Sequence, residues 1–155
     1  MQQTDTALVV AQAQALFDGE RDPIANAANL ASLIGTTIDA LNWSGVYLLR
    51  DNELVLGPFY GRPATARIAV GKGVCGAAAQ RRETIVVPDV NAFPGHIACD
   101  PASKSEIVVP LLQAGRLIGV LDIDSPIPNR FNEEDRELFE QLARLLVESC
   151  DWSKS

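Results

Sequence analysis

The chain has 155 residues, 47% of them hydrophobic, enough for one domain with a sizeable core that needs no metal or disulfide staples. Lys and Arg number 13 against 20 Asp and Glu, and the net charge of −7 argues against binding to nucleic acid or to an anionic membrane. The polar N-terminus is unlike a signal peptide, and no apolar stretch reaches the length of a membrane span. We therefore expect a cytoplasmic protein.

The first half of the chain predicts two helices followed by three strands. A helix is expected over residues 4–17, and a second from Asp22-Pro23, an N-cap followed by proline at the first helical position, to about residue 40. Strands over 44–49 and 53–60 flank a short turn and form a hairpin. A third, short strand is expected over 66–70.

The second half predicts one short helix, three more strands and a terminal helix. In chain order these are a helix over 74–82, a strand over 85–87, a long irregular segment over 88–103, strands over 106–112 and 117–124, and a helix capped by Asn132. Because consecutive strands are joined by hairpins, the six-stranded sheet should be mostly antiparallel. The pattern predicts an α+β fold with helices packed on that sheet.

The three cysteines are too scattered for a disulfide framework or a zinc site. Cys75 lies in the first turn of the short helix, where free N–H groups and the helix dipole favour a thiolate. Cys99 lies three residues after His96, whose imidazole could take the thiol proton. Each of these two cysteines is either redox-active or a small buried hydrophobe. Cys150, on the apolar stripe of the last helix, is predicted to be structural.

Acidic residues end an otherwise apolar strand. Asp122 and Asp124 are two apart, so they project from one face, which Ile118 should share. Glu106 joins them if residues 113–115 form a three-residue loop, whereas a two-residue loop places it on the other face. Pro110 disturbs the ladder and could mark a bulge in it. Such a cluster could bind an ammonium group or, because crowding raises a carboxyl pKa, donate a proton. In the alternative, Asp124 caps the following turn and Asp122 is solvated.

Two aromatic residues lie at the start of the first strand. Trp43 and Tyr47 are four residues apart on one face, with Gly45 between them. The pair could wall an apolar ligand pocket, or it could be ordinary core packing.

Long motifs in this sequence resemble one enzyme family. Residues 88–100 (PDVNAFPGHIACD) and 105–110 (SEIVVP) are similar to the free methionine-(R)-sulfoxide reductases, which are built on a single GAF domain. Further matches, within a resemblance that runs from about residue 26 to residue 146, are 73–76 (GVCG), 42–47 (NWSGVY) and 119–125 (GVLDIDS). The resemblance implies a single GAF domain over residues 1–155, with an N-terminal helix and turn over 1–22 and a core over 23–150.

The resemblance also implies roles for particular residues. Cys99 would attack the sulfoxide sulfur of free methionine-(R)-sulfoxide and retain the oxygen as a sulfenic acid. A second cysteine would then form a disulfide that thioredoxin reduces. The family's active-site acids correspond to Glu106, Asp122 and Asp124, which would hold the substrate ammonium and deliver a proton; Trp43 would pack on the methyl end of the substrate and Tyr47 would line the pocket. No metal or organic cofactor is implied, and a homodimer is expected.

One departure from the family concerns the second cysteine. Thr65 occupies the position, ten residues before Cys75, where many members carry a cysteine. Cys75 is then the resolving candidate, unless an external thiol reduces Cys99 directly. Two other functions compete with the reductase: a GAF sensor that binds a nucleotide or amino acid without catalysis, and a thiol switch made of Cys75 and Cys99 that does not turn over.

Overall fold

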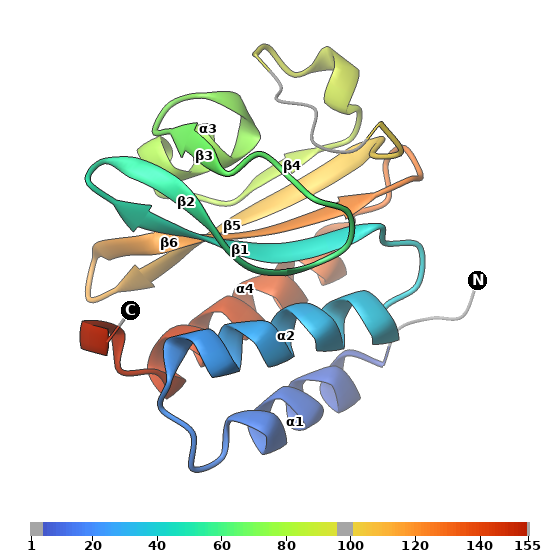
Figure 1. Cartoon of the computed structure of the whole chain (residues 1–155). Coiled ribbons are helices and arrows are strands. Elements are labelled where there is room, and N and C mark those ends of the chain that lie inside the picture. The colour runs from blue at the N-terminus through green and yellow to red at the C-terminus, as the bar shows by residue number, and fades with distance from the viewer. Residues whose placement is uncertain (1–4, 96–100, 155) are drawn as a thin grey trace.

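The computed structural model describes residues 5–95 and 101–154, and its elements follow the predicted order (Figure 1). They are α1 (Thr6–Phe17), α2 (Pro23–Thr37), β1 (Trp43–Arg50), β2 (Glu53–Tyr60), β3 (Arg67–Ala69), α3 (Gly73–Arg81), β4 (Ile85–Val87), the 3-10 turn η1 (Val90–Ala92), β5 (Ser105–Gln113), β6 (Arg116–Ser125), α4 (Glu133–Ser149) and the 3-10 turn η2 (Trp152–Lys154). Within these described ranges, no helix is both long enough and apolar enough to cross a membrane.

The six strands form one sheet in the order β3-β2-β1-β6-β5-β4, and every neighbouring pair is antiparallel. Helices α1, α2 and α4 lie on one side of the sheet, whereas α3 lies on the other (Figure 1). The larger apolar cluster fills the space between the sheet and the three long helices. A smaller cluster lies under α3. The prediction of an α+β fold with a six-stranded antiparallel sheet is confirmed.

Helix ends follow the local signals closely. The Asp22 carboxylate accepts hydrogen bonds from the first turn of α2, and Asn132 forms a capping box with Asp135 at the start of α4. Helix α2 ends at Thr37, earlier than the expected residue 40, because the backbone is already extended at Ile38 and turns left-handed at Ala40 (φ 62°). Helix α1 buries four residues in the larger core, so it shares that core with the elements that follow. The boundary at residue 22 stays a prediction.

The β5–β6 hairpin has the shorter of the two loops that the sequence left open. Its loop has two residues, Ala114 and Gly115, both at positive φ (51° and 81°), so the three-residue alternative does not form. The register then shifts by one residue between Leu111 and Leu112, as at a β-bulge. This extra residue returns Glu106 to the face of Asp124, its cross-strand partner.

The same bulge changes the side to which Ile118 points. Ile118 packs in the core beneath the three long helices, and Leu117 takes its place in the smaller cluster under α3. The expectation that Ile118 shares a face with Asp122 was therefore wrong, because the alternation of sides is interrupted at the bulge.

Candidate active site

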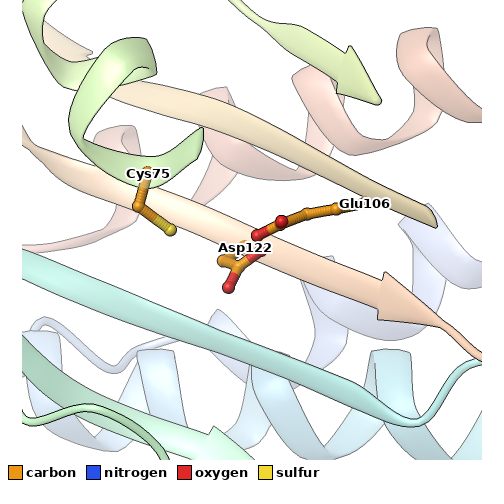
Figure 2. A group of neighbouring side chains, drawn as sticks. All are labelled: Cys75, Glu106 and Asp122. Atoms are coloured by element: carbon orange, nitrogen blue, oxygen red, sulfur yellow. The ribbon is translucent and has the colours of Figure 1, made fainter. Parts of the chain in front are cut away.

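Three carboxylates and one thiol meet on the α3 side of the sheet. Strands β5 and β6 carry Glu106, Asp122 and Asp124, which we call the acid cluster, and their exposed fractions are only 6–7%. Cys75 comes from α3, and its Sγ and carboxylate oxygens of Glu106 and Asp122 all lie within 4.8 Å of one another (Figure 2). The structure thus brings together four of the predicted site residues.

These four residues line a small cavity, which we call the acid cavity. Its volume is about 20 Å³, room for roughly one water-sized group. The other described lining residues come from β1, β3, the start of α3 and the end of the long segment: Tyr47, Ile68, Lys72, Gly73, Val74 and Ser103. A cavity of this size with several carboxylates suits a small cation or a primary ammonium group.

The position of Cys75 depends on close packing at the start of α3. A Cβ at Gly76 would lie 2.6 Å from the Ala69 carbonyl oxygen, so only glycine lets the helix approach the end of β3. Burial, followed by the charges of Asp122, Glu106 and Asp124, raises the pKa of the Cys75 thiol well above its usual value. This direction is opposite to the thiolate expected in the first turn of a helix, because desolvation and then the surrounding carboxylates act against the helix dipole.

The carboxyl group of Asp122 has a pKa well above the usual value for aspartate. Burial raises its pKa first, and the neighbouring charge of Glu106 raises it further. Its Oδ1 is buried and has no hydrogen-bond partner among the described residues. Asp122 therefore keeps its proton to a higher pH than an ordinary aspartate, as the sequence suggested for at least one member of the cluster.

Replacing Asp122 with asparagine should stabilise the protein at neutral pH. A raised folded-state pKa means that the wild type loses stability as the pH rises above the ordinary aspartate value of about 4, because the folded state then resists ionisation. We expect Asp122→Asn to raise the free energy of unfolding by about 1–3 kcal/mol at pH 7 and by much less at pH 4. Urea unfolding at both pH values measures this, and a variant that is less stable at both would contradict it. Glu137→Gln, at an exposed site on α4, is the control and should stay within about 0.5 kcal/mol.

Of the two aromatic residues, Tyr47 forms part of the cavity wall and Trp43 packs behind it. Tyr47 lines the acid cavity, and its hydroxyl donates to the Thr65 carbonyl oxygen (2.9 Å). Trp43 is 2% exposed and stacks on Tyr47 and Phe59, with ring centroids 6.1 and 5.4 Å apart, and it is not among the described residues that line the cavity. Gly45 makes this stacking possible, because a Cβ there would lie 2.6 Å from the Trp43 ring.

The long segment before β5 returns to the sheet beside the acid cluster. Cys99 and His96 lie outside the described residues. Backbone hydrogen bonds join the two ends of the segment to each other and to β6. The Val90 N–H donates to the Lys104 carbonyl (2.9 Å), and the Lys104 N–H donates to the Ser125 carbonyl (2.7 Å). The end of the segment therefore lies next to the acid cavity, which Ser103 lines.

Two polar lining residues, Lys72 and Ser103, were not singled out from the sequence. Lys72 is the N-cap residue of α3 and the one cationic side chain among the described residues of the cavity wall. The Ser103 hydroxyl accepts a hydrogen bond from the Asn42 side-chain amide (3.0 Å). A lysine between two glycines at a helix start could have drawn attention to the first, but no local pattern marks the second.

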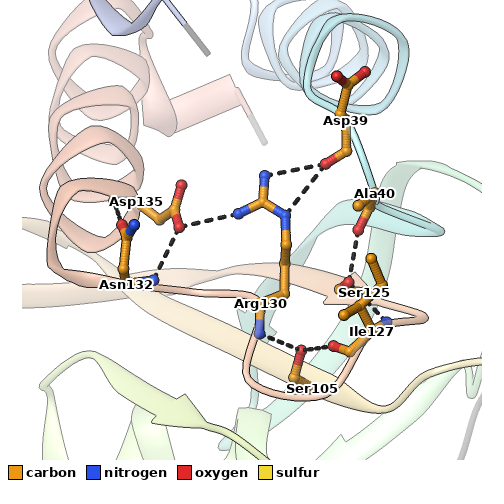
Figure 3. Close-up of polar contacts among 8 residues, drawn as sticks. All are labelled: Asp39, Ala40, Ser105, Ser125, Ile127, Arg130, Asn132 and Asp135. Carbon is orange, nitrogen blue, oxygen red and sulfur yellow. Dashed lines mark hydrogen bonds and ion pairs between the residues drawn. The ribbon is translucent and has the colours of Figure 1, made fainter. Parts of the chain in front are cut away.

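Buried hydroxyl groups hold the strand ends that carry the acid cluster (Figure 3). Ser105 and Ser125 are cross-strand partners, and each is adjacent in sequence to a member of the cluster. The Ser105 hydroxyl donates to the Ile127 carbonyl and the Ser125 hydroxyl to the Ala40 carbonyl, both at 2.6 Å. These bonds tie β5 and β6 to the turn after β6 and to the α2–β1 connection.

Arg130 completes this network, and its loss should destabilise the protein strongly. Its guanidinium donates to the Asp39 carbonyl (3.0 and 3.3 Å) and pairs with Asp135 (3.0 Å), with side chains only 9% and 12% exposed. Because Arg130→Met removes the positive charge that is paired with the buried Asp135 carboxylate, we expect a cost of about 3–5 kcal/mol in urea unfolding. Arg67→Met breaks the exposed pair with Glu53 and is the matched control, expected within about 1 kcal/mol. Equal losses in the two variants would contradict the assignment.

The chain is similar to a known domain family and to named proteins over most of its length. The family model for the GAF domain matches residues 7–149. An Escherichia coli protein named free methionine-R-sulfoxide reductase is 48% identical over 144 residues, which are 90% of this chain and 87% of that protein.

Two solved structures have the same fold. A Neisseria meningitidis free methionine-R-sulfoxide reductase, solved in complex with its substrate, has a TM-score of 0.90 and 42% identity over 96% of this chain and 92% of that one. A Burkholderia vietnamiensis protein, described provisionally as a GAF sensor, has a TM-score of 0.91 and 57% identity over 96% of this chain and 94% of that one.

Proposed function

This chain belongs to the GAF domain family and, within it, to the free methionine-R-sulfoxide reductases, and we propose that it reduces free methionine-R-sulfoxide with Cys99 as its nucleophile. It is an oxidoreductase by this membership. The other residues in the proposal are the acid cluster, Cys75, Tyr47 and Trp43.

The acid cavity is the observation that carries this proposal. Three buried carboxylates surround a space sized for one small group, and a substrate ammonium would supply the positive charge that they need. A free amino acid has this ammonium, whereas a methionine sulfoxide inside a peptide chain does not. The geometry therefore favours a free amino acid as the substrate.

The proposed first step transfers oxygen from the substrate to the enzyme. Cys99 attacks the sulfoxide sulfur, the substrate S–O bond breaks, and the oxygen stays on Cys99 as a sulfenic acid while methionine leaves. Cys99 is oxidised by two electrons and the substrate sulfur is reduced by two. The sulfoxide oxygen needs a proton. Because the pKa of Asp122 is raised, we propose that this carboxyl group supplies it.

The described flank of the long segment supports Cys99 in this role. Ser103 lines the acid cavity, and four residues of chain reach at most about 14 Å. Position 99 is thus within chain reach of the acid cluster.

In the second step, Cys75 attacks the Cys99 sulfenic acid, a disulfide forms and water leaves. Cys75 Sγ already lies in the acid cavity, and the nearby carboxylates can accept its proton. Thioredoxin then reduces the disulfide to two thiols, which requires a reducing compartment such as the cytoplasm. We further propose a homodimer, supported by the exposed Leu8 and Leu16 on α1.

The proposed function is tested by assaying both epimers of free methionine sulfoxide with thioredoxin and its reductase. We expect repeated turnover of the R epimer and little turnover of the S epimer or of a peptide that contains the R sulfoxide. Consumption of neither epimer, with tight binding of another metabolite, would favour the sensor. Release of one methionine per chain, with no further turnover when thioredoxin is present, would favour the thiol switch.

A further inference from the structure

We propose that the acid cavity also binds a thiophilic divalent cation of the Zn²⁺ class, through Cys75 Sγ and the carboxylates of Glu106 and Asp122. The bound ion would occupy the space of the substrate ammonium and so exclude the substrate. Ion binding is argued from the cavity alone, whereas the exclusion of substrate rests on the proposed function.

The three ligand atoms are arranged closely enough to share one ion. They lie within 4.8 Å of one another, in side chains whose exposed fractions are 5–6% (Figure 2). Zinc binds cysteine sulfur at about 2.3 Å and carboxylate oxygen at about 2.0–2.2 Å, so small rotations of these side chains bring all three to bonding distance. A cavity of about 20 Å³ holds an ion of this kind with at most about one water.

Asp122 provides an independent sign that a ligand belongs here. Its Oδ1 is buried and has no hydrogen-bond partner among the described residues. Buried carboxylate oxygens are nearly always paired, so this lone pair is available to a cation. Figure 2 shows the Asp122 and Glu106 carboxylates and the Cys75 sulfur gathered in one space between α3 and the sheet.

The charge balance and the sulfur ligand select the kind of ion. Asp124 adds a third carboxylate to the cavity, and Lys72 is the one cationic side chain among its described lining residues. One thiolate among oxygen ligands favours Zn²⁺ or Cd²⁺ over Mg²⁺ and Ca²⁺, which prefer oxygen alone. When the ion binds, the Cys75 S–H bond and the O–H bond of a protonated Asp122 break, sulfur–metal and oxygen–metal bonds form, and the protons leave to solvent.

The ion site is tested with Cd²⁺ and the reduced full-length chain. In a Cys99→Ser, Cys150→Ser background, Cys75 is the single thiol, so the thiolate-to-Cd²⁺ absorbance reports this site alone. We expect the band to saturate at one ion per chain. Adding Asp122→Asn should weaken Cd²⁺ binding at least about 10-fold, while Glu137→Gln, exposed on α4, should leave it unchanged. Circular dichroism verifies that each variant is folded.

Two outcomes would overturn the ion site. The first is that the Cys99→Ser, Cys150→Ser variant is folded but shows no thiolate-to-Cd²⁺ absorbance band. The second is that the Cd²⁺ concentration at the midpoint of the titration is the same with and without Asp122→Asn. Neither measurement involves turnover, so both leave the reductase assay on the wild-type chain as an independent result.

The exclusion of substrate is tested by competition in the same background. Free methionine, the proposed product, should raise the Cd²⁺ concentration at the midpoint, whereas N-acetylmethionine, which lacks the ammonium, should not. A midpoint that free methionine does not move would overturn the exclusion of substrate.

Discussion

Replacing Cys99 with serine is expected to lower kcat/KM for free methionine-R-sulfoxide at least about 10³-fold, with the thermal midpoint nearly unchanged. The proposed chemistry needs a sulfur that attacks the sulfoxide and then carries the oxygen. A hydroxyl is a far weaker nucleophile and cannot form a sulfenic acid. The thioredoxin-coupled assay measures the loss, and calorimetry verifies the fold.

Cys150→Ala is the matched control for Cys99→Ser. Cys150 is 1% exposed at the C-cap of α4, where the Asn26 amide donates to its sulfur (3.5 Å), and it does not line the acid cavity. We expect this variant to lose some stability but to keep kcat/KM within about 2-fold. Full turnover by Cys99→Ser would contradict the nucleophile assignment, because no other residue is proposed to carry the oxygen.

Glu106→Gln is expected to lower kcat/KM by about 10²–10⁴-fold, the second-largest effect. The change keeps the side-chain shape but removes one of the charges that would hold the substrate ammonium, and it alters the carboxyl group beside Asp122. The loss should appear mainly for substrates with a free ammonium group. N-acetylmethionine sulfoxide, which lacks it, should be a poor substrate for the wild type and little worse for the variant.

Steady-state kinetics with both substrates provide the readout, because a merely structural defect would lower both rates in proportion. Glu137→Gln makes the same chemical change at an exposed site and should leave kcat/KM within about 2-fold. If Glu106→Gln kept wild-type kcat/KM for the free amino acid, the ammonium would have to bind elsewhere.

Local signals predicted most of the secondary structure. Proline after Asp22 and the capping box at Asn132 mark helix starts that depend only on neighbouring residues. The period-two spacing of Asp122 and Asp124 likewise placed both on one face, because side-chain alternation in a strand is also local.

Pro110 signalled a possible bulge in the β5–β6 hairpin, but its effect on the register could not be predicted in the same way. Leu117 and Ile118 are both apolar, so the hydrophobic pattern does not show which of them points toward the three long helices. With an unbroken ladder, only a three-residue loop would have placed Glu106 beside Asp122 and Asp124. The structure places it there instead through a two-residue loop and a bulge.

The protonation of Cys75 depends on residues that are distant in sequence. The first turn of a helix favours a thiolate, but the three carboxylates that oppose it arrive from β5 and β6. Trp43 is likewise positioned by a residue that is distant in sequence, because its ring stacks on Phe59 of β2 as well as on Tyr47. Contacts between elements that are distant in sequence, including the burial of Cys75 between α3 and the sheet, decide both features.

In the proposed mechanism, a sulfoxide held by its ammonium on the acid cluster presents its sulfur to Cys99. A crystal structure of the full chain carrying Cys99→Ser, with free methionine-R-sulfoxide bound, would show this arrangement. We expect the ammonium nitrogen within hydrogen-bond distance of carboxylates of Glu106, Asp122 or Asp124, and the sulfoxide sulfur in contact with the side chain at position 99. A ligand whose ammonium faces away from these carboxylates, or whose sulfur lies far from position 99, would contradict it.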